Sequence, residues 1–266
     1  MKDINEQNNL KEYSDIDLKI ESPLAWIILN RPQKLNAITP RMIMEIEDAL
    51  NKLRDNSDVK VIIFMGSGEK AFSAGADIAL LKEADDASIR HNLTTRLSEV
   101  LMLIEKYPKP IIAAIRGYAL GGGLELALAC DFRLASENSI IGLPEINLGL
   151  LPAGGGVQRL IKNVGIARAK EIAMLGELID CNEAKRVGLI TKILSNDNFV
   201  EEVKKFALKI AELPQLALKA IKLSILAESE PPYFSGQILE SFVFELLIAS
   251  RDSKERINAF LEQRNK

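Results

Sequence analysis

The sequence predicts an α/β fold, and two observations carry this prediction. Through residues 14–198, short apolar runs rich in β-branched residues alternate with longer amphipathic stretches, which is typical of strands alternating with helices. From residue 199 onward, every segment has helical periodicity. We therefore expect an α/β core over residues 14–198, a helical oligomerisation region over 199–266 and a flexible tail over 1–13.

The first predicted elements are two strands and a helix. Asp15–Glu21 and Ala25–Asn30 have the apolar and β-branched content of strands. Thr39 is a suitable N-cap, and Pro40 suits the first position of a helix. We therefore expect a helix over residues 40–55, with its recurring apolar residues on one buried face.

The middle of the chain contains two more buried strands, each followed by a loop of small residues. Val59–Met65 is apolar except for Lys60, and Pro110–Ile115 is a continuous apolar run. Glycine, alanine and serine dominate the loop 66–77 after the first strand, and three consecutive glycines follow the second. A helical stretch over about 78–106, with an irregular middle, connects them. Loops that follow buried strands are the usual sites in α/β proteins.

The second half of the core repeats this pattern with shorter elements. Asp131–Ala135 and Ser139–Gly142 are predicted to be a strand pair, and a second loop rich in glycine and proline follows at 143–156. The remaining expected elements are helices from about Val157 and over Ile166–Leu175 and Cys181–Arg186, a strand over Leu189–Leu194, and helices over 199–211, 215–228, 233–249 and 253–264.

Composition narrows the possible functions. The chain has 266 residues, of which 47% are hydrophobic and 27% charged, and its net charge is -3. These values are ordinary for a globular protein and give no reason to expect nucleic acid or anionic lipid as a partner. The first residues lack the apolar core of a signal peptide, and no apolar run is long enough to span a membrane, so we expect a cytoplasmic protein.

The chain has one histidine, which limits its acid–base chemistry. His91 lies in the polar segment 85–95 and is expected on the surface. A zinc site of the HExxH type is excluded, and no cluster has metal-ligand spacing, so we expect no metal. Two cysteines do not indicate a disulfide framework. General acid–base work should therefore fall to carboxylates.

The stretch Gly117–Asp131 has the features of a binding site. Gly121, Gly122 and Gly123 lie between a predicted strand and helix, where glycine allows a sharp turn and the close approach of another molecule. The start of a helix offers free N–H groups to an anion, or to an oxygen that becomes anionic during a reaction. Glu125 is the carboxylate of an otherwise apolar helix.

A structural role explains the same residues. Glu125 falls in the first helical turn, where the helix dipole favours a carboxylate, and the glycines can form a simple tight turn. A dinucleotide fingerprint starting at Gly121 would need glycine where Leu126 stands, and no phosphate loop ending in GK[ST] is present.

Several stretches together resemble the crotonase family, also called the enoyl-CoA hydratase/isomerase superfamily. They are AFSAGAD at 71–77, GYALGGGLELALACD at 117–131 and GLPEINLGLLPAGGGVQRL at 142–160, with LNRP at 29–32, NAI at 36–38 and AFLEQR at 259–264. The resemblance implies a spiral of ββα units with a C-terminal helical trimerisation region. It also implies a trimer or dimer of trimers and an acyl-CoA thioester substrate, with no cofactor besides the coenzyme A that the substrate carries.

The resemblance also implies roles for particular residues. The backbone N–H groups of Ala76 and Gly122 would form an oxyanion hole for the thioester oxygen. Hydratases of the family carry two glutamates, and this chain has both, Glu125 and Glu145. The pair would hold and activate water for addition at C3, and Glu145 would exchange the proton at C2. Substrate contacts are expected from Leu35, Ala37, Ala74, Gly75, Asp77, Ile78, Gly121 and Pro144.

The chain departs from the family pattern in places that bear on the acyl pocket and the CoA phosphates. Ala153 to Val157 read AGGGV where glycine-alanine-glycine-glycine-threonine is usual, and Lys82 follows the AGADI segment only after Ala79-Leu80-Leu81. Arg256 stands where the family often has glycine.

Three functions are compared for a chain of this kind. The leading hypothesis is reversible syn hydration of trans-2-enoyl-CoA to 3-hydroxyacyl-CoA, or the reverse dehydration. The alternative is an enoyl-CoA isomerase that uses Glu145 as its single base. A distant alternative is an RNA-binding relative, but the predicted helix near 39–55 carries three basic and four acidic residues, which disfavours phosphate binding.

Overall fold

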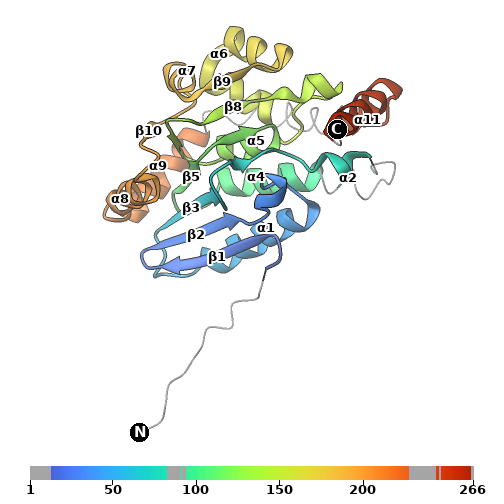
Figure 1. Ribbon diagram of the computed structural model, residues 1–266. Coiled ribbons are helices and arrows are strands. Elements are labelled where there is room, and N and C mark those ends of the chain that lie inside the picture. The colour runs from blue at the N-terminus through green and yellow to red at the C-terminus, as the bar shows by residue number, and fades with distance from the viewer. Residues whose placement is uncertain (1–12, 83–90, 92–93, 228–243, 246, 265–266) are drawn as a thin grey trace.

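Two β-sheets organise the computed structural model, which describes residues 13–82, 91, 94–227, 244–245 and 247–264 (Figure 1). In spatial order, the larger sheet contains β1 (Ile16–Glu21), β2 (Leu24–Leu29), β3 (Val61–Gly66), β5 (Ile111–Ile115), β7 (Phe132–Ser136) and β10 (Lys192–Leu194). The smaller sheet contains β4 (Ala71–Ser73), β6 (Tyr118–Leu120), β8 (Ile140–Gly142) and β9 (Leu178–Asp180).

The strand pairing produces a spiral. The chain passes from β3 to β4, from β5 to β6 and from β7 to β8, so each unit gives one strand to each sheet. The neighbours from β2 to β10 pair in parallel in the larger sheet, as do β4, β6 and β8 in the smaller one. Only the described pairs β1–β2 and β8–β9 are antiparallel. The predicted α/β spiral of ββα units is confirmed.

Helices connect these units, and the described elements after β10 are also helices. They are α1 (Pro40–Arg54), α2 (Ile78–Lys82), α4 (Thr95–Glu105), α5 (Gly122–Ala129), α6 (Gly156–Leu175), α7 (Cys181–Arg186), α8 (Phe199–Ala211), α9 (Gln215–Ala227) and α11 (Arg251–Arg264), with 3-10 turns η1 (Pro32–Lys34) and η2 (Pro144–Leu148). Thr39 caps α1 as predicted, because its hydroxyl accepts the Met42 amide at 3.0 Å. Gly165 has φ 75° inside α6, which separates the two helices expected there.

Some predicted segments fall outside the described residues. They are nearly all of the tail 1–13, the middle of the helical stretch 78–106 and most of the helix 233–249.

Alternating side chains of the larger sheet enter two apolar cores. One face, which includes Ile27 and Phe64, packs with apolar residues of α1, α4 and α5. The other face, which includes Trp26 and Ile63, packs with α8 through residues such as Val203. Figure 1 shows α8 and α9 at one side of this sheet, and α11 beside α2 at the far side of the molecule. The C-terminal helices thus pack at two separate places on the core.

Three sequence expectations are wrong in detail. Asp131–Ala135 and Ser139–Gly142 do not pair, because β7 lies between β5 and β10 while β8 lies between β6 and β9. The sequence did not reveal β4, β6 and β9, since three residues are too few to show an alternating pattern. The last strand of the larger sheet is shorter than Leu189–Leu194, because Leu189 and Ile190 are buried without joining it.

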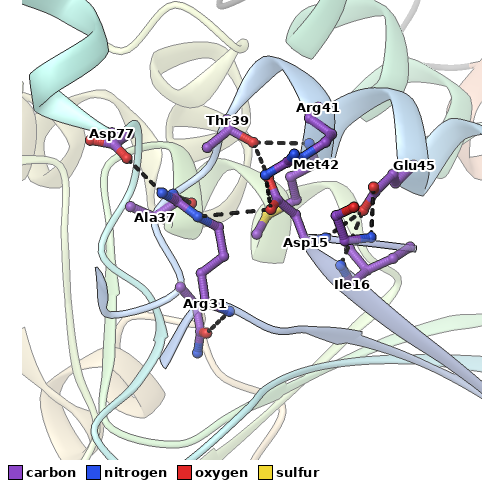
Figure 2. A network of polar contacts seen from close by, with 11 residues as sticks. Asp15, Ile16, Arg31, Ala37, Thr39, Arg41, Met42, Glu45 and Asp77 are labelled. Carbon is purple, nitrogen blue, oxygen red and sulfur yellow. Dashed lines mark hydrogen bonds and ion pairs between the residues drawn. The ribbon is translucent and has the colours of Figure 1, made fainter. Parts of the chain in front are cut away.

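A polar network ties β1 to α1 and to the loop after β4 (Figure 2). The Asp15 carboxylate accepts hydrogen bonds from the Thr39 hydroxyl and from Arg41, the latter at 2.8 Å. Arg31 lies 4.0 Å from Asp15 and 3.0 Å from Asp77. Burial opposes ionisation of Asp15, but the hydrogen bonds from Arg41 and Thr39 and the charge of Arg31 outweigh it and hold the pKa of Asp15 below its usual value.

Asp15→Asn is expected to lower the free energy of unfolding by about 1.5–3 kcal/mol near neutral pH, because hydrogen bonds to a buried charged group are weakened. A lowered folded pKa gives stability that is present above the unfolded value of 3.8 and is lost as pH falls through the folded value. The difference between wild type and variant should therefore shrink below about pH 4. Urea unfolding followed by circular dichroism checks this, with Asp58→Asn, at an exposed carboxylate, as the control. A difference that does not change with pH would contradict the assignment.

Candidate active site

Three loops meet at one edge of the smaller sheet. Because β4, β6 and β8 are parallel neighbours, their carboxyl ends lie side by side. The loop 74–77 follows β4, Gly121 and Gly122 follow β6, and Pro144 and Glu145 follow β8. The carboxyl ends of parallel strands are where α/β proteins usually build their sites. The small sheet therefore brings together loops that lie far apart in the sequence.

A cavity of about 90 Å³ lies where these loops meet. Its wall includes many of the predicted site residues, namely Ala74, Gly75, Ala76, Ile78, Gly121, Gly122, Glu125, Pro144 and Glu145. The rest of the wall is almost entirely apolar and consists of Leu81, Leu97, Leu148, Leu150, Leu151, Ala153, Gly154 and Phe244. An apolar cavity with a few polar groups is the usual form of a site for a small molecule.

Leu35, Ala37 and Asp77 do not line this cavity but support the loop beside it. The Leu35 carbonyl accepts the Ala74 amide at 2.9 Å. Arg31 donates to the Ala37 carbonyl at 2.8 Å and to the Asp77 carboxylate at 3.0 Å (Figure 2). These contacts hold the segment around residue 76 in place, while substrate binding by the three residues stays a prediction.

Two backbone N–H groups lie close together at the cavity. Ile38 bonds to the Gly75 carbonyl and the Asp77 amide, so the amide of Ala76 between them points away from Ile38. Gly122 is the first residue of α5, where amides have no partner within the helix. A Cβ built on Gly122 would lie 3.6 Å from the Ala76 nitrogen. Within the described part of the chain, neither amide donates a hydrogen bond to the protein.

Glu125 is a buried carboxylate held by the second glycine loop. It is 2% exposed in the apolar helix α5. Its Oε1 accepts hydrogen bonds from the amides of Gly154 at 2.8 Å and Gly156 at 2.9 Å. A Cβ on Gly154 would lie 2.9 Å from the carboxylate, and one on Gly156 would lie 2.7 Å from it. Glycine at both positions therefore lets the backbone approach closely enough to bind the carboxylate.

The electrostatics of Glu125 are a balance of opposing effects. Burial raises the pKa of Glu125, whereas the Gly156 amide, the charge of Arg159 and the Gly154 amide act to lower it. The net effect is a raised pKa. A carboxyl group whose pKa is moved toward neutrality is well suited to exchange protons at physiological pH.

Glu145 reaches the same cavity from η2. Its side chain is partly buried, and a Cβ built on Gly121 would lie 2.9 Å from its Oε1, so the carboxylate lies against the backbone that leads into α5. Glu125 and Glu145 come from different elements, yet both line the cavity wall. The arrangement therefore places two carboxylates and two unoccupied amide donors around one apolar space.

Sequence reasoning missed several residues of this site. Leu97 lies within a stretch correctly predicted to be helical, but periodicity does not say which apolar residue reaches a cavity. Phe244 is far from the motifs along the chain. Arg159 stands in the quoted QRL sequence, yet its burial beside the site has no sequence signal.

Other functional expectations concern the surface and metals. His91 is exposed, as predicted. Both cysteines are buried and free. Among the described residues, no group of three His, Cys, Asp or Glu side chains could hold a metal ion. No helix in that same part of the chain is long and apolar enough to cross a membrane.

Comparisons with known proteins show the family of this chain. The sequence model of the Enoyl-CoA hydratase/isomerase family matches residues 19–266. A crotonyl-CoA hydratase from Syntrophomonas wolfei is 39% identical over 95% of this chain and 96% of that protein. A short-chain-enoyl-CoA hydratase from Clostridium acetobutylicum is 34% identical over 95% of this chain and 97% of that protein.

Solved structures give the same result. The crystal structure of an enoyl-CoA hydratase from Mycobacterium avium subsp. paratuberculosis aligns with a TM-score of 0.85 and 30% identity, over 95% of this chain and 97% of that one. Sequence and structure thus agree over nearly the full length of the chain, and the protein belongs to the enoyl-CoA hydratase/isomerase family.

Proposed function

We propose that the protein catalyses the reversible syn addition of water to a trans-2-enoyl-CoA, which gives a 3-hydroxyacyl-CoA. The observation that carries the proposal is that Glu125 and Glu145 line the same cavity as Ala76 and Gly122. Two relatives of the protein are a crotonyl-CoA hydratase and a short-chain-enoyl-CoA hydratase, which supports an enoyl-CoA substrate. Coenzyme A then enters as part of the substrate, and the reaction needs no further cofactor.

The amides of Ala76 and Gly122 would stabilise the charge that develops during the reaction. When water adds at C3, the electrons of the double bond move toward the thioester and its oxygen becomes enolate-like. Two donors fixed in a mostly apolar cavity can bind that oxygen without reorganisation, which is the usual basis of oxyanion-hole catalysis. The proximity of Ala76 to Gly122 supports this role, because a Cβ built on Gly122 would lie 3.6 Å from the Ala76 nitrogen.

The two glutamates would perform the proton transfers. Water held between the carboxylates passes one proton to Glu125 as its oxygen bonds to C3, and Glu145 gives its own proton to C2. Return of the proton from Glu125 to Glu145 restores the pair for the next turnover. The water molecule is thereby divided between the two carbons, and the reverse sequence releases it. The burial of Glu125 favours proton exchange near neutral pH. Because two neighbouring carboxylates titrate as a pair, the pair rather than either residue defines the pH dependence.

The isomerase alternative needs Glu145 alone. It explains Glu145 and the amides, but it leaves no chemical task for a second carboxylate, Glu125, that is buried at a cost and lines the same cavity. This observation favours hydration over isomerisation.

The RNA-binding alternative needs free cations on α1. Arg41 instead pairs with Asp15, just before β1, and Lys52 pairs with a carboxylate one turn earlier on α1. Arg54 lies over the ring of Tyr107. The basic groups of α1 are therefore engaged within the protein, which disfavours phosphate binding there.

Product analysis tests the proposed reaction. Purified protein should convert crotonyl-CoA to 3-hydroxybutyryl-CoA, followed by the loss of the enoyl-thioester absorbance and by mass spectrometry. A parallel series of longer 2-enoyl-CoA and of 3-enoyl-CoA substrates distinguishes hydration from isomerisation. Conversion of 3-enoyl-CoA without any hydration of 2-enoyl-CoA would replace the proposal with the isomerase alternative.

Glu125→Gln and Glu145→Gln are each expected to lower kcat by roughly 10²–10⁴, because glutamine keeps the shape but cannot transfer a proton. KM should change far less, since most of the CoA moiety binds outside the carboxylate pair. The double variant should be little worse than the poorer single variant, because the residues act as a unit. Glu137→Gln, at an exposed position between the two, is the matched control. Full turnover by Glu125→Gln would rule out the two-carboxylate mechanism.

Gly122→Pro should lose most of its turnover, because proline has no N–H to donate to the thioester oxygen. The expected decrease in kcat is about 10²–10³. Gly122→Ala is the matched control, since it adds a Cβ in ordinary contact with its neighbours and keeps the amide. Equal rates for the two variants, with circular dichroism spectra like that of wild type, would remove the Gly122 amide from the mechanism.

We also propose that the protein is a homo-oligomer, a trimer or a dimer of trimers. Large apolar side chains are exposed along α9, among them Leu216 at 81% and Ile225 at 65%. Such faces commonly mark an interface. Within the predicted oligomerisation region 199–266, residues 228–243 lie outside the described residues. Light scattering at micromolar concentration should give at least three times the chain mass, and a monomeric mass would contradict the proposal.

A further inference from the structure

Arg159 is a buried cation beside the candidate active site. It is 1% exposed and, by volume, heads the fully buried side chains of the described residues. Removing a guanidinium from water is costly, so a buried arginine needs partners that compensate for the lost hydration. Its position in α6, three residues after Gly156, places it next to the loop that binds Glu125.

The partners of Arg159 connect two elements around the site. One terminal nitrogen, Nη1, donates to the carbonyl of Gly154. The other, Nη2, donates to Oε2 of Glu105 at 2.8 Å. Glu105 is the last residue of α4 and is 15% exposed, so the ion pair is shielded from solvent. A planar guanidinium can hold two acceptors in fixed directions at once, which the single nitrogen of lysine does less well.

Gly154 is the link between Arg159 and Glu125. Its carbonyl accepts from Arg159, while its amide donates to Oε1 of Glu125 at 2.8 Å. Both groups flank one Cα, so a hydrogen bond that fixes the carbonyl also limits rotation of the amide. Glycine is the residue most free to rotate, and an external restraint therefore matters most here.

We propose that Arg159 is a positioning residue for the hydration reaction: it fixes Gly154 against Glu125 and sets a permanent positive charge beside this buried carboxylate. The inference rests on the proposed function, because it assigns Arg159 to the reaction in which Glu125 accepts a proton. Arg159 does not line the cavity wall and acts through Gly154 and through its charge.

Charged groups from several elements surround Glu125, and Arg159 is the one that acts to lower its pKa. Arg159 faces Glu125 from α6, Glu145 shares the cavity from η2, and Glu105 pairs with Arg159 from α4. Lys162 interacts with Glu105 and Arg159. Burial raises the pKa of Glu125 and the charge of Arg159 opposes that rise, so loss of the arginine should leave more of Glu125 protonated near neutral pH.

Two variants separate positioning from simple packing. Arg159→Met keeps an unbranched, apolar side chain in the core but removes the charge and both hydrogen bonds. Arg159→Lys keeps the charge but not the forked geometry. Arg168→Met is the matched control, since Arg168 lies on the same helix and pairs with Glu171 and Glu177, neither of which lines the cavity.

The pH dependence of kcat/KM for crotonyl-CoA is the first readout. In Arg159→Met the acid limb should move upward by about one to three pH units, the usual effect of losing an opposite charge near a carboxyl group. In Arg159→Lys the limb should stay near that of wild type, while kcat falls roughly 10–100-fold with little change in KM, because the Glu125 carboxylate is less well placed. The control should match wild type in both respects.

Infrared spectroscopy gives a second readout that needs no turnover. The C=O stretch of protonated Glu125, identified by subtracting the spectrum of Glu125→Gln, should disappear at a higher pH in Arg159→Met than in wild type. A wild type without hydratase activity would overturn the proposed function, and the infrared titration would then still report whether Arg159 sets the charge state of Glu125.

The following results would overturn the inference. An unshifted acid limb and an unshifted infrared titration in folded Arg159→Met would reduce Arg159 to a packing role. If Arg159→Met does not fold, Arg159→Lys decides the question, because kcat equal to that of wild type would show that the forked contact with Gly154 does not position Glu125.

Discussion

Placing the carboxylate of Glu125 in an apolar interior is the constraint on which much of the structure depends. Such a group is costly to bury unless donors replace its hydration. The donors here are backbone amides of Gly154 and Gly156, and they can reach the carboxylate only because neither residue has a Cβ. The start of α6 is thereby fixed against α5. Arg159 of α6 also pairs with Glu105, the last residue of α4, so the polar contacts around Glu125 reach a third helix. The burial of one carboxylate thus constrains both the glycine loop and the packing of α4, α5 and α6.

The site also requires three distant loops to lie together, and the smaller sheet brings them to one place. The loops that contain Ala76, Gly122 and Glu145 follow three parallel strands of only three residues each. Such short strands would be marginal alone. The preceding strands β3, β5 and β7 lie side by side in the larger sheet, so they deliver the chain to the small sheet already in order. The order of β3, β5 and β7 in the larger sheet therefore sets the order in which the loops of the smaller sheet lie side by side.

The sequence could predict those features that depend on nearest neighbours or on a recognisable motif. The Thr39 cap, the buried strand over 110–115 and the break near Gly165 all follow from local preferences. The glycine motifs led to most of the cavity wall, including both glutamates. Sequence reasoning failed where one residue has no local signature. Nothing in the sequence near Arg159 shows that it pairs with Glu105. The true partners of β8 are β6 and β9, which have three residues each and no detectable period, so the sequence wrongly predicts that β8 pairs with β7.

The apolar wall of the cavity also depends on packing that the sequence motifs do not reveal. Leu81, Leu150, Ala153 and Phe244 belong to one apolar cluster that also contains Ile257 of α11. The helix α11 contacts both α2, which begins just after Ala76, and η2, which carries Glu145. The motifs therefore place the proposed reacting groups, whereas the shape of the apolar wall depends on how α11 packs against α2 and η2.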